Sequence, residues 1–188
     1  MKKFLNFIKN PKFKMICILA FLLFIYTTIC AISYAKSVSE DLENSVFRLH
    51  VIANSDSKED QNLKYIVRDK LLQYMNSYLS NTSTKEDAIK IANEHLDEFK
   101  QVAINTIKEQ GYSYNVNVKV GNFEFPTKTY GDISLPAGFY DALRVEIGEA
   151  KGNNYWCILY PPLCMVDYEK DTKIEYKSKI IEILSNLF

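Results

Sequence analysis

Residues 46–60 have the sequence VFRLHVIANSDSKED, and this stretch decides the fold because a strand pattern in it passes directly into a helix start. Apolar side chains occupy every second position, which is typical of a strand with one buried face. Residues 54–57 favour turns and helix N-caps. Ser57 and Asp60 have the spacing of a capping box, with Asp in place of the usual Glu. The stretch therefore predicts a strand at 46–53 followed by a helix.

Two long helices are expected after this strand. Apolar residues recur at steps of three and four between Leu63 and Leu79, which indicates an amphipathic helix of about five turns. Thr84 begins a second helix of the same kind, and Gly111 is well placed to end it.

The apolar period changes to two beyond Gly111. It predicts strands at 114–120, 123–130, 142–148 and 155–160, the second of them weakened by Pro126. Lys151–Asn154 is expected as a hairpin loop, and residues 176–188 as a short amphipathic helix. This order predicts an α+β fold in two layers, a mostly antiparallel sheet with the two long helices on one face.

The N-terminal segment predicts a membrane-directed helix. Five lysines precede an uncharged apolar run from Met15 to Ala35, which is long enough to cross a bilayer. The lysines favour a cytoplasmic start, so the chain from Lys36 onward is expected on the far side of the membrane. Ser33-Tyr34-Ala35 fits a small-x-small cleavage site. We therefore expect residues 1–35 to be a signal peptide cleaved after Ala35 or a retained anchor, followed by a spacer at 36–45 and one domain at 46–188.

The composition of the exported part limits its function. Without the five N-terminal lysines, 18 of the 23 basic residues remain beside 23 acidic ones, a net charge of −5. Such a domain has no electrostatic footprint for nucleic acid, and we expect no nucleic-acid partner. Its many Tyr and Phe residues, with few Gly and Pro, indicate a packed core.

No assembled catalytic or metal site is visible in the sequence. His50 and His95 fall on different predicted elements and form no ligand-spaced pair, and phosphate-loop, nucleophile-elbow and zinc-protease motifs are absent. We expect no catalytic residue, metal or cofactor. The alternative is an extracytoplasmic hydrolase of cell wall or peptides that uses His50 with Cys157 or a nearby acid.

Cys157 and Cys164 are the two cysteines that follow the N-terminal segment. Pro161-Pro162-Leu163 between them can turn the chain back, and an extracytoplasmic location permits disulfides. A disulfide between them is expected, and two buried free thiols are the alternative.

The sheet face away from the two helices is the main functional candidate. Trp, Tyr and Arg are enriched at protein interfaces, and a sheet face without a third layer can serve as a docking surface. The alternative is that the C-terminal helix covers this face. The candidate contact residues are Arg48, His50, Arg144, Trp156 and Tyr160.

Three segments together resemble one family. They are FRLHVIANSDSKEDQ at 47–61 with VRD at 67–69, LRVEIG at 143–148 with Gly152, and YWCILYPPLC at 155–164. With them the chain is similar to the stage II sporulation protein R family of endospore-forming bacteria, over nearly all of residues 46–188 and the N-terminal segment.

The resemblance implies a signalling protein rather than an enzyme. Proteins of this family are made in the forespore and exported into the space between the two septal membranes. There they trigger a membrane-embedded aspartic protease of the mother cell, stage II sporulation protein GA, which then removes the pro-sequence of sigma factor E. The resemblance supplies no catalytic residues, so the matched positions are candidates for the fold or for contact with that partner.

Overall fold

The computed structural model describes residues 11–79, 82–130 and 133–162 of the chain. The chain divides into two compact units, Met1–Leu42 and Glu43–Phe188. Each unit is described by itself.

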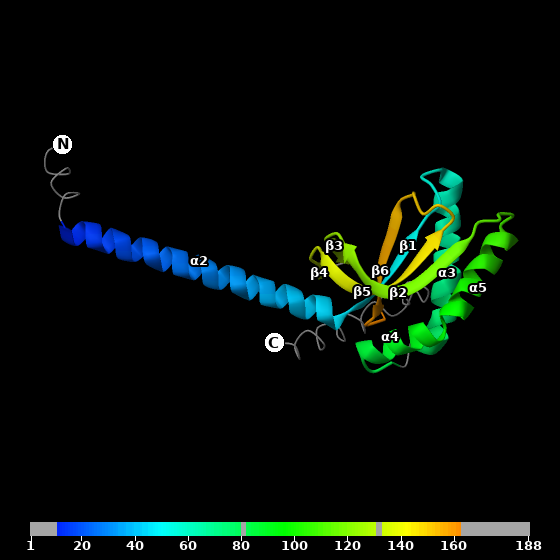
Figure 1. Cartoon of the computed structure of the whole chain (residues 1–188), viewed down its shortest axis with the longest axis horizontal. Coiled ribbons are helices and arrows are strands. Elements are labelled where there is room, and N and C mark those ends of the chain that lie inside the picture. Colours follow the sequence, from blue (N-terminus) through cyan, green and yellow to red (C-terminus); the bar gives the residue numbers. More distant parts are fainter. Residues whose placement is uncertain (1–10, 80–81, 131–132, 163–188) are drawn as a thin grey trace. The chain divides into compact units, whose positions relative to one another are not determined.

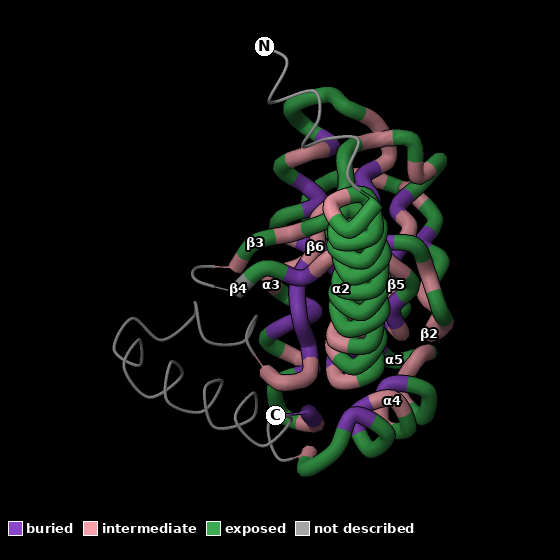
Figure 2. Tube along the Cα trace, turned by 90° about the vertical axis from the view of Figure 1, so that its left-hand side faces the viewer, coloured by how far each residue is buried: buried purple, intermediate pink, exposed green. Residues whose placement is uncertain are grey.

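The first unit is dominated by helix α2 (Pro11–Ser45), which is continuous over 35 residues and has no buried residue (Figure 2). Large apolar side chains such as Phe21 and Leu23 are more than 60% exposed along it. Within the described part of the chain, α2 is the one helix long and apolar enough to cross a membrane. This helix is compatible with the predicted signal or anchor.

Residues 36–45, which the sequence predicts as a spacer, are the last turns of α2. The segment contains neither Gly nor Pro to stop the helix, and Lys36 forms an i,i+4 ion pair with Glu40 at 3.6 Å. The predicted cleavage position after Ala35 therefore lies inside a helix.

The second unit is built on a four-stranded sheet in the order β2-β5-β1-β6. The strands are β1 (Phe47–Ile52), β2 (Val116–Phe125), β5 (Gly138–Ile147) and β6 (Asn154–Tyr160). β1 is parallel to β5, whereas the β1–β6 and β2–β5 pairs are antiparallel. The predicted α+β class with a mostly antiparallel sheet is confirmed.

Two details of the predicted strands are wrong. Lys151–Asn154 does not close a hairpin, because β1 lies between β5 and β6 in the sheet. The separate strands expected at 114–120 and 123–130 are instead one strand, β2, which pairs with β5 without interruption up to Phe125. Within the range 123–130, the part after Pro126 forms only the short strand β3 (Lys128–Tyr130). This strand pairs with β4 (Ile133–Leu135) as a two-stranded hairpin.

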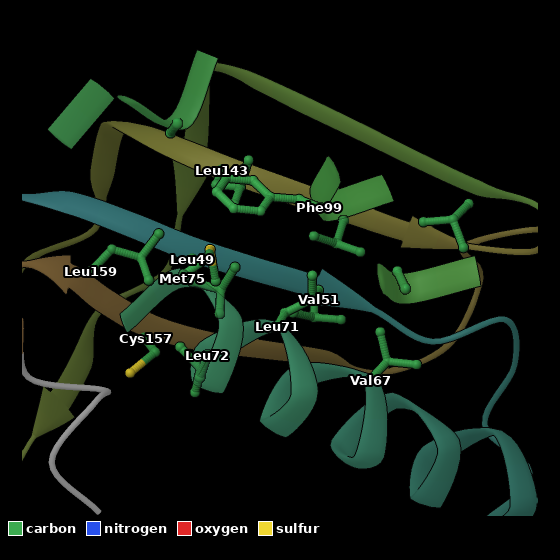
Figure 3. Packing of buried hydrophobic residues seen from close by; sticks show 14 of the residues in the cluster. Leu49, Val51, Val67, Leu71, Leu72, Met75, Phe99, Leu143, Cys157 and Leu159 are labelled. Atoms are coloured by element: carbon green, nitrogen blue, oxygen red, sulfur yellow. The ribbon is translucent and has the colours of Figure 1, made fainter. Parts of the chain in front are cut away.

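Helices α3 (Lys58–Leu79) and α5 (Leu96–Glu109) lie on one side of the sheet (Figure 1). Leu49 and Val51 of β1 face Leu71 and Met75 of α3, and all four side chains are fully buried (Figure 3). Phe99 of α5 is also fully buried in this cluster. Burial of such a side chain contributes about 1.5–3 kcal/mol, so this apolar layer is the main source of stability.

The second predicted helix is divided into α4 (Lys85–Glu94) and α5 at His95, whose φ of −108° and ψ of 15° are not helical. The predicted ends are present. Thr84 caps α4 by accepting a hydrogen bond from the amide of Asp87. Gly111, at φ 83°, ends α5 in a left-handed conformation that favours glycine. The helix expected at 176–188 lies outside the described residues.

Candidate functional site on the open sheet face

The open face is the side of the sheet away from α3 and α5. Strand register places Lys119 of β2, Arg144 of β5, His50 of β1 and Trp156 of β6 at neighbouring positions across all four strands. Side chains from distant parts of the sequence therefore form one row. Arg48 lies one step along β1, between Ala142 and Ile158.

His50 is buried within this row, with 4% of its surface exposed. Its ring stacks on Trp156 with centroids 3.8 Å apart, and Nε2 lies 2.9 Å from Oδ1 of Asn154. Burial lowers the pKa of His50 to about 4, against the opposing effect of the Asn154 hydrogen bond. His50 is therefore neutral at pH 7 and is not exposed to a partner in this conformation.

The predicted alternative of a His50–Cys157 dyad is contradicted by the fold. Cys157 pairs with Leu49 in the ladder and belongs to the helix-side core (Figure 3), whereas His50 belongs to the opposite face. Cys157 is also disulfide-bonded, so it has no free thiol. Its predicted partner, Cys164, lies outside the described residues, and that pairing stays a prediction.

Arg48 is fully buried on the open face. Its guanidinium lies 4.0 Å from the ring centre of Phe125 and 4.5 Å from that of Tyr140, and Nη2 donates a 2.8 Å hydrogen bond to the hydroxyl of Tyr130. Nε and Nη1 have no hydrogen-bond partner among the described residues. The cation is thus held by aromatic faces and lies beneath the β3–β4 hairpin, so as a contact residue it is hidden.

The accessible part of the row is an ion cluster beside an aromatic ring. Glu146 accepts a hydrogen bond from Asn117 at 2.8 Å and pairs with Lys119 at 3.1 Å. Arg144 Nε lies 2.9 Å from the same carboxylate without the alignment of a hydrogen bond, and its guanidinium is 5.2 Å from the ring centre of Phe123. Burial alone would raise the pKa of Glu146, but its hydrogen bonds and the two cations lower it.

The open face carries a small core of its own, which neither the open docking face nor the covering C-terminal helix considered from the sequence included. The β3–β4 hairpin contributes Leu135 to this core and packs Tyr130 against it. What remains half-buried is Lys119, Phe123, Arg144 and Trp156. Besides Leu135, the buried members of this small core are Val46, Phe125, Tyr140, Ala142 and Ile158.

Tyr160 was predicted on the open face, and this placement is wrong. A bulge in β6 places Phe47 opposite Tyr160 and Arg48 opposite Ile158. Tyr160 therefore packs against the helix-side core, and its hydroxyl donates a 2.7 Å hydrogen bond to the carbonyl of Ser83.

The residues after β1 are structural. Asp60 accepts hydrogen bonds from Asn54 at 2.8 Å and Ser55 at 2.5 Å, and its amide is capped by Ser57. Asp56 accepts a 2.7 Å hydrogen bond from the main-chain amide of Asn153, which connects this turn to the loop before β6. Among the described residues no group of three or more His, Cys, Asp or Glu side chains is placed to hold a metal.

Sequence reasoning missed Lys119, Phe123, Phe125 and Asn154 as members of the site. Each is placed by the register of a strand whose neighbour could not be deduced from the sequence. The alternation over 114–120 places Lys119 on the face opposite Val118 and Val120, but Phe123 was assigned to a separate strand, and the position of Arg144 and Glu146 beside Lys119 was not predicted.

The fold and the face define an α+β domain after an apolar helix, with an aromatic and charged surface on one side of its sheet. The sequence model of the family described as Stage II sporulation protein R matches residues 43–170. The stage II sporulation protein R of Bacillus subtilis (strain 168) is 33% identical over 134 residues, 71% of this chain and 60% of that protein. No solved structure gives a significant match. The chain belongs to the stage II sporulation protein R family.

Proposed function

We propose that the chain is an exported signalling protein of sporulation, made in the forespore. In this proposal it reaches the space between the septal membranes and activates the membrane-embedded aspartic protease of the mother cell, stage II sporulation protein GA. That protease then removes the pro-sequence of sigma factor E. The observation that carries the proposal is the family match over residues 43–170, which includes every described strand of the second unit.

The geometry supports action by contact rather than by catalysis. His50 is neutral and covered, and it lies on the opposite face from Cys157. The accessible side chains of the open face include two cations and two aromatic rings. Arg and Trp with partial burial are typical of residues that dominate binding energy at protein interfaces. We take Arg144 and Trp156 as the leading contact residues.

The N-terminal helix supports export. The apolar part of α2 is about 20 residues, or about 30 Å of helix, which matches the hydrocarbon thickness of a bilayer. Export follows in this proposal from insertion of α2 with its lysines in the cytoplasm. The chain spans 60% of the length of the Bacillus subtilis relative, so the partner and the pathway are part of the proposal.

The test is complementation of sporulating cells that lack their own copy of the gene. The full chain should restore cleavage of the sigma factor E precursor, detected by immunoblot. Arg144→Ala and Trp156→Ala should reduce cleavage about tenfold each, as for residues at the centre of an interface. Lys108→Ala, at the end of α5 on the other side of the sheet, is the matched control and should leave cleavage unchanged.

Two outcomes would contradict this function. One is absence of precursor cleavage with the full wild-type chain present at normal level. The other is turnover of wall fragments or peptides by the purified chain that disappears in His50→Gln, which would establish a hydrolase.

A further inference from the structure

The sheet has two edge strands, and one of them has no further neighbour among the described residues. β2 forms the edge beside β5 and is ten residues long. The other edge, β6, has interactions beyond those of the ladder at Tyr155, Cys157 and Ile158. We therefore consider the outer side of β2.

The hydrogen bonding of β2 can be followed residue by residue. The amide of Gly148 donates to the carbonyl of Asn115 at 2.8 Å, so residues 115 and 148 occupy a hydrogen-bonded position at the end of the β2–β5 ladder. Hydrogen-bonded and non-hydrogen-bonded pairs alternate in an antiparallel ladder, so the odd-numbered residues of β2 bond to β5. The main-chain N–H and C=O groups that point away from β5 belong to Val116, Val118, Val120, Asn122 and Glu124.

No described residue outside the ladder forms a hydrogen bond with these outward groups. Proteins usually protect such an edge with a proline, a bulge or a charge directed across it. β2 contains no proline and pairs with β5 without a register shift. Its one lysine, Lys119, is drawn back over the sheet by Glu146 at 3.1 Å.

The spacing of these groups identifies the ligand class. Donors and acceptors that repeat along about 33 Å of strand are matched by the main chain of an extended polypeptide. On the helix side the half-exposed Val118 and Val120 would take apolar side chains. On the open side the ammonium of Lys119 favours an acidic side chain.

We propose that the domain accepts an extended segment of its membrane-bound partner protein as an added strand along the outer edge of β2. The inference rests on the proposed function, because it specifies how the partner is contacted. The added strand would lie beside Lys119 and Phe123, next to Arg144, so the edge and the accessible part of the open face form one continuous surface.

One two-fold pairing with a second copy of this chain is disfavoured at the same edge. In a two-fold antiparallel pairing, the register that matches Val118 with Val120 of the other copy places the two Lys119 side chains directly opposite each other. Like charges in that position destabilise the pairing. A partner segment with an acidic residue at that position has no such conflict.

The test changes the edge without changing the ladder. Val120→Pro removes one outward amide that makes no bond to β5, and proline is tolerated on the solvent side of an edge strand. Val120→Ala trims the side chain and keeps the amide. In complemented sporulating cells with equal protein levels, Val120→Pro should reduce precursor cleavage about tenfold, whereas Val120→Ala should stay within about threefold of wild type.

A second measurement does not depend on the folding of the proline variant. A photo-crosslinking amino acid at Glu124, an exposed residue of β2, should link the full chain to a larger membrane protein. The same amino acid at Glu109, at the end of α5, is the control and should give no such product.

The outcomes separate the inference from the function on which it rests. Wild-type cleavage with Val120→Pro, no product from Glu124, or a product that contains two copies of this chain would each overturn the edge proposal while leaving the function intact. Failure of the wild-type chain to support cleavage at all would overturn the function itself.

Discussion

His50 shows how burial can remove a titratable residue from chemistry. The ring stacks on Trp156, and its Nδ1 has no hydrogen-bond partner among the described residues. Protonation would place a charge in this apolar setting close to the cations Arg144 and Arg48. The carboxylate of Glu146 raises the pKa of His50, but this effect is smaller than the lowering caused by burial.

This burial predicts a specific dependence of stability on pH. The pKa of His50 is about 4 in the folded chain, below its ordinary value of 6.5. The unfolded chain therefore binds more protons between these values, and the free energy of unfolding falls as pH decreases from 6.5 to 4. The expected loss is up to about 3 kcal/mol, at 1.36 kcal/mol for each pKa unit. Chemical denaturation at a series of pH values measures it.

His50→Gln is the control for this prediction. The glutamine keeps an amide donor for Asn154 and cannot titrate. The stability of this variant should be nearly flat between pH 6.5 and 4.5. The carboxylates with lowered pKa values, Asp141 and Glu146, lose their contributions only at lower pH. An unchanged slope in His50→Gln would show that another group is responsible.

Arg48 leads to a second prediction at the same scale. Its buried charge has one hydrogen bond and lies within about 6 Å of three aromatic rings, with no ion pair among the described residues. Replacement of a buried charge by an apolar side chain of similar length is often neutral or stabilising. Arg48→Met should therefore change the free energy of unfolding by less than about 1 kcal/mol, whereas Arg48→Ala should cost about 2–4 kcal/mol because it leaves a cavity.

The same variants decide whether Arg48 has a role beyond packing. Stability is measured by urea denaturation, and function by precursor cleavage in complemented cells. A stable Arg48→Met chain with normal precursor cleavage would show that Arg48 contributes only to packing of the small core. A drop of more than about 3 kcal/mol in Arg48→Met would show that the cation–π contacts outweigh the burial of the charge.

The alternation of β1, β5 and β6 was sufficient to assign Arg48, His50, Arg144 and Trp156 to one face, because side chains alternate strictly along a regular strand. It was not sufficient for Tyr160, since a bulge adds one residue and reverses the face beyond it. Burial of Arg48 could not be predicted either. It depends on the β3–β4 hairpin, whose position is set by tertiary contacts.

At the scale of elements, the turn after β1 and the loop before β6 are joined by main-chain hydrogen bonds. Gly152 donates its amide to the carbonyl of Ala53, and Lys151 donates its amide to that of Asn54. A Cβ atom at Gly152 would overlap the carbonyl oxygen of Ser55 and lie 2.9 Å from Cβ of Ala53. Main-chain atoms cannot move aside without breaking these bonds, so the position requires glycine.

Gly152→Ala should therefore destabilise the domain by about 2–3 kcal/mol. Gly121→Ala is the matched control, because its Cβ would meet only the ring of Phe123, at 3.1 Å, and a side chain can shift. Gly121→Ala should lower the free energy of unfolding by less than about 1 kcal/mol. Thermal unfolding of both variants measures the difference, and equal losses would show that the loop contact is not the cause.

The elements differ in how far local sequence determined them. The caps at Thr84 and Gly111 were predicted correctly because each rests on the chemistry of a few neighbouring residues. The break at His95 was not predicted, since no Gly or Pro marks it. There the ring packs 4.0 Å from that of Tyr78, and Nδ1 lies 2.9 Å from Oε2 of Glu98. The pairing of β1 between β5 and β6 depends on contacts far apart in sequence.

At the scale of the whole molecule, the two units differ in where their apolar side chains lie. The strands and helices of the second unit enclose an apolar core, whereas α2 has no buried residue and its large apolar side chains are exposed (Figure 2). Exposure of such a helix to water is unfavourable at about 25 cal/mol for each Å² of apolar surface. A membrane, or the export machinery that handles signal peptides, removes that penalty.

Leu22→Arg tests this role of α2 directly. Leu22 lies in the middle of the apolar run, where an arginine opposes insertion by about 2.5–3.5 kcal/mol. The variant should leave the domain in the cytoplasm, protected when protease is added outside cells stripped of their wall. Ser37→Arg, beyond the run, is the control and should be digested like the wild type.

The mass of the exported chain then separates anchor from signal. A mature protein that begins at Lys36 would show cleavage after Ala35, and the full mass would show a retained helix. Cleavage would let the domain cross the intermembrane space by diffusion. An anchored domain would instead have to contact a protein of the opposite membrane while α2 stays in the membrane of the cell that made it. Normal export of Leu22→Arg would instead mean that α2 does not direct the chain across the membrane, and the proposed location would have to be abandoned.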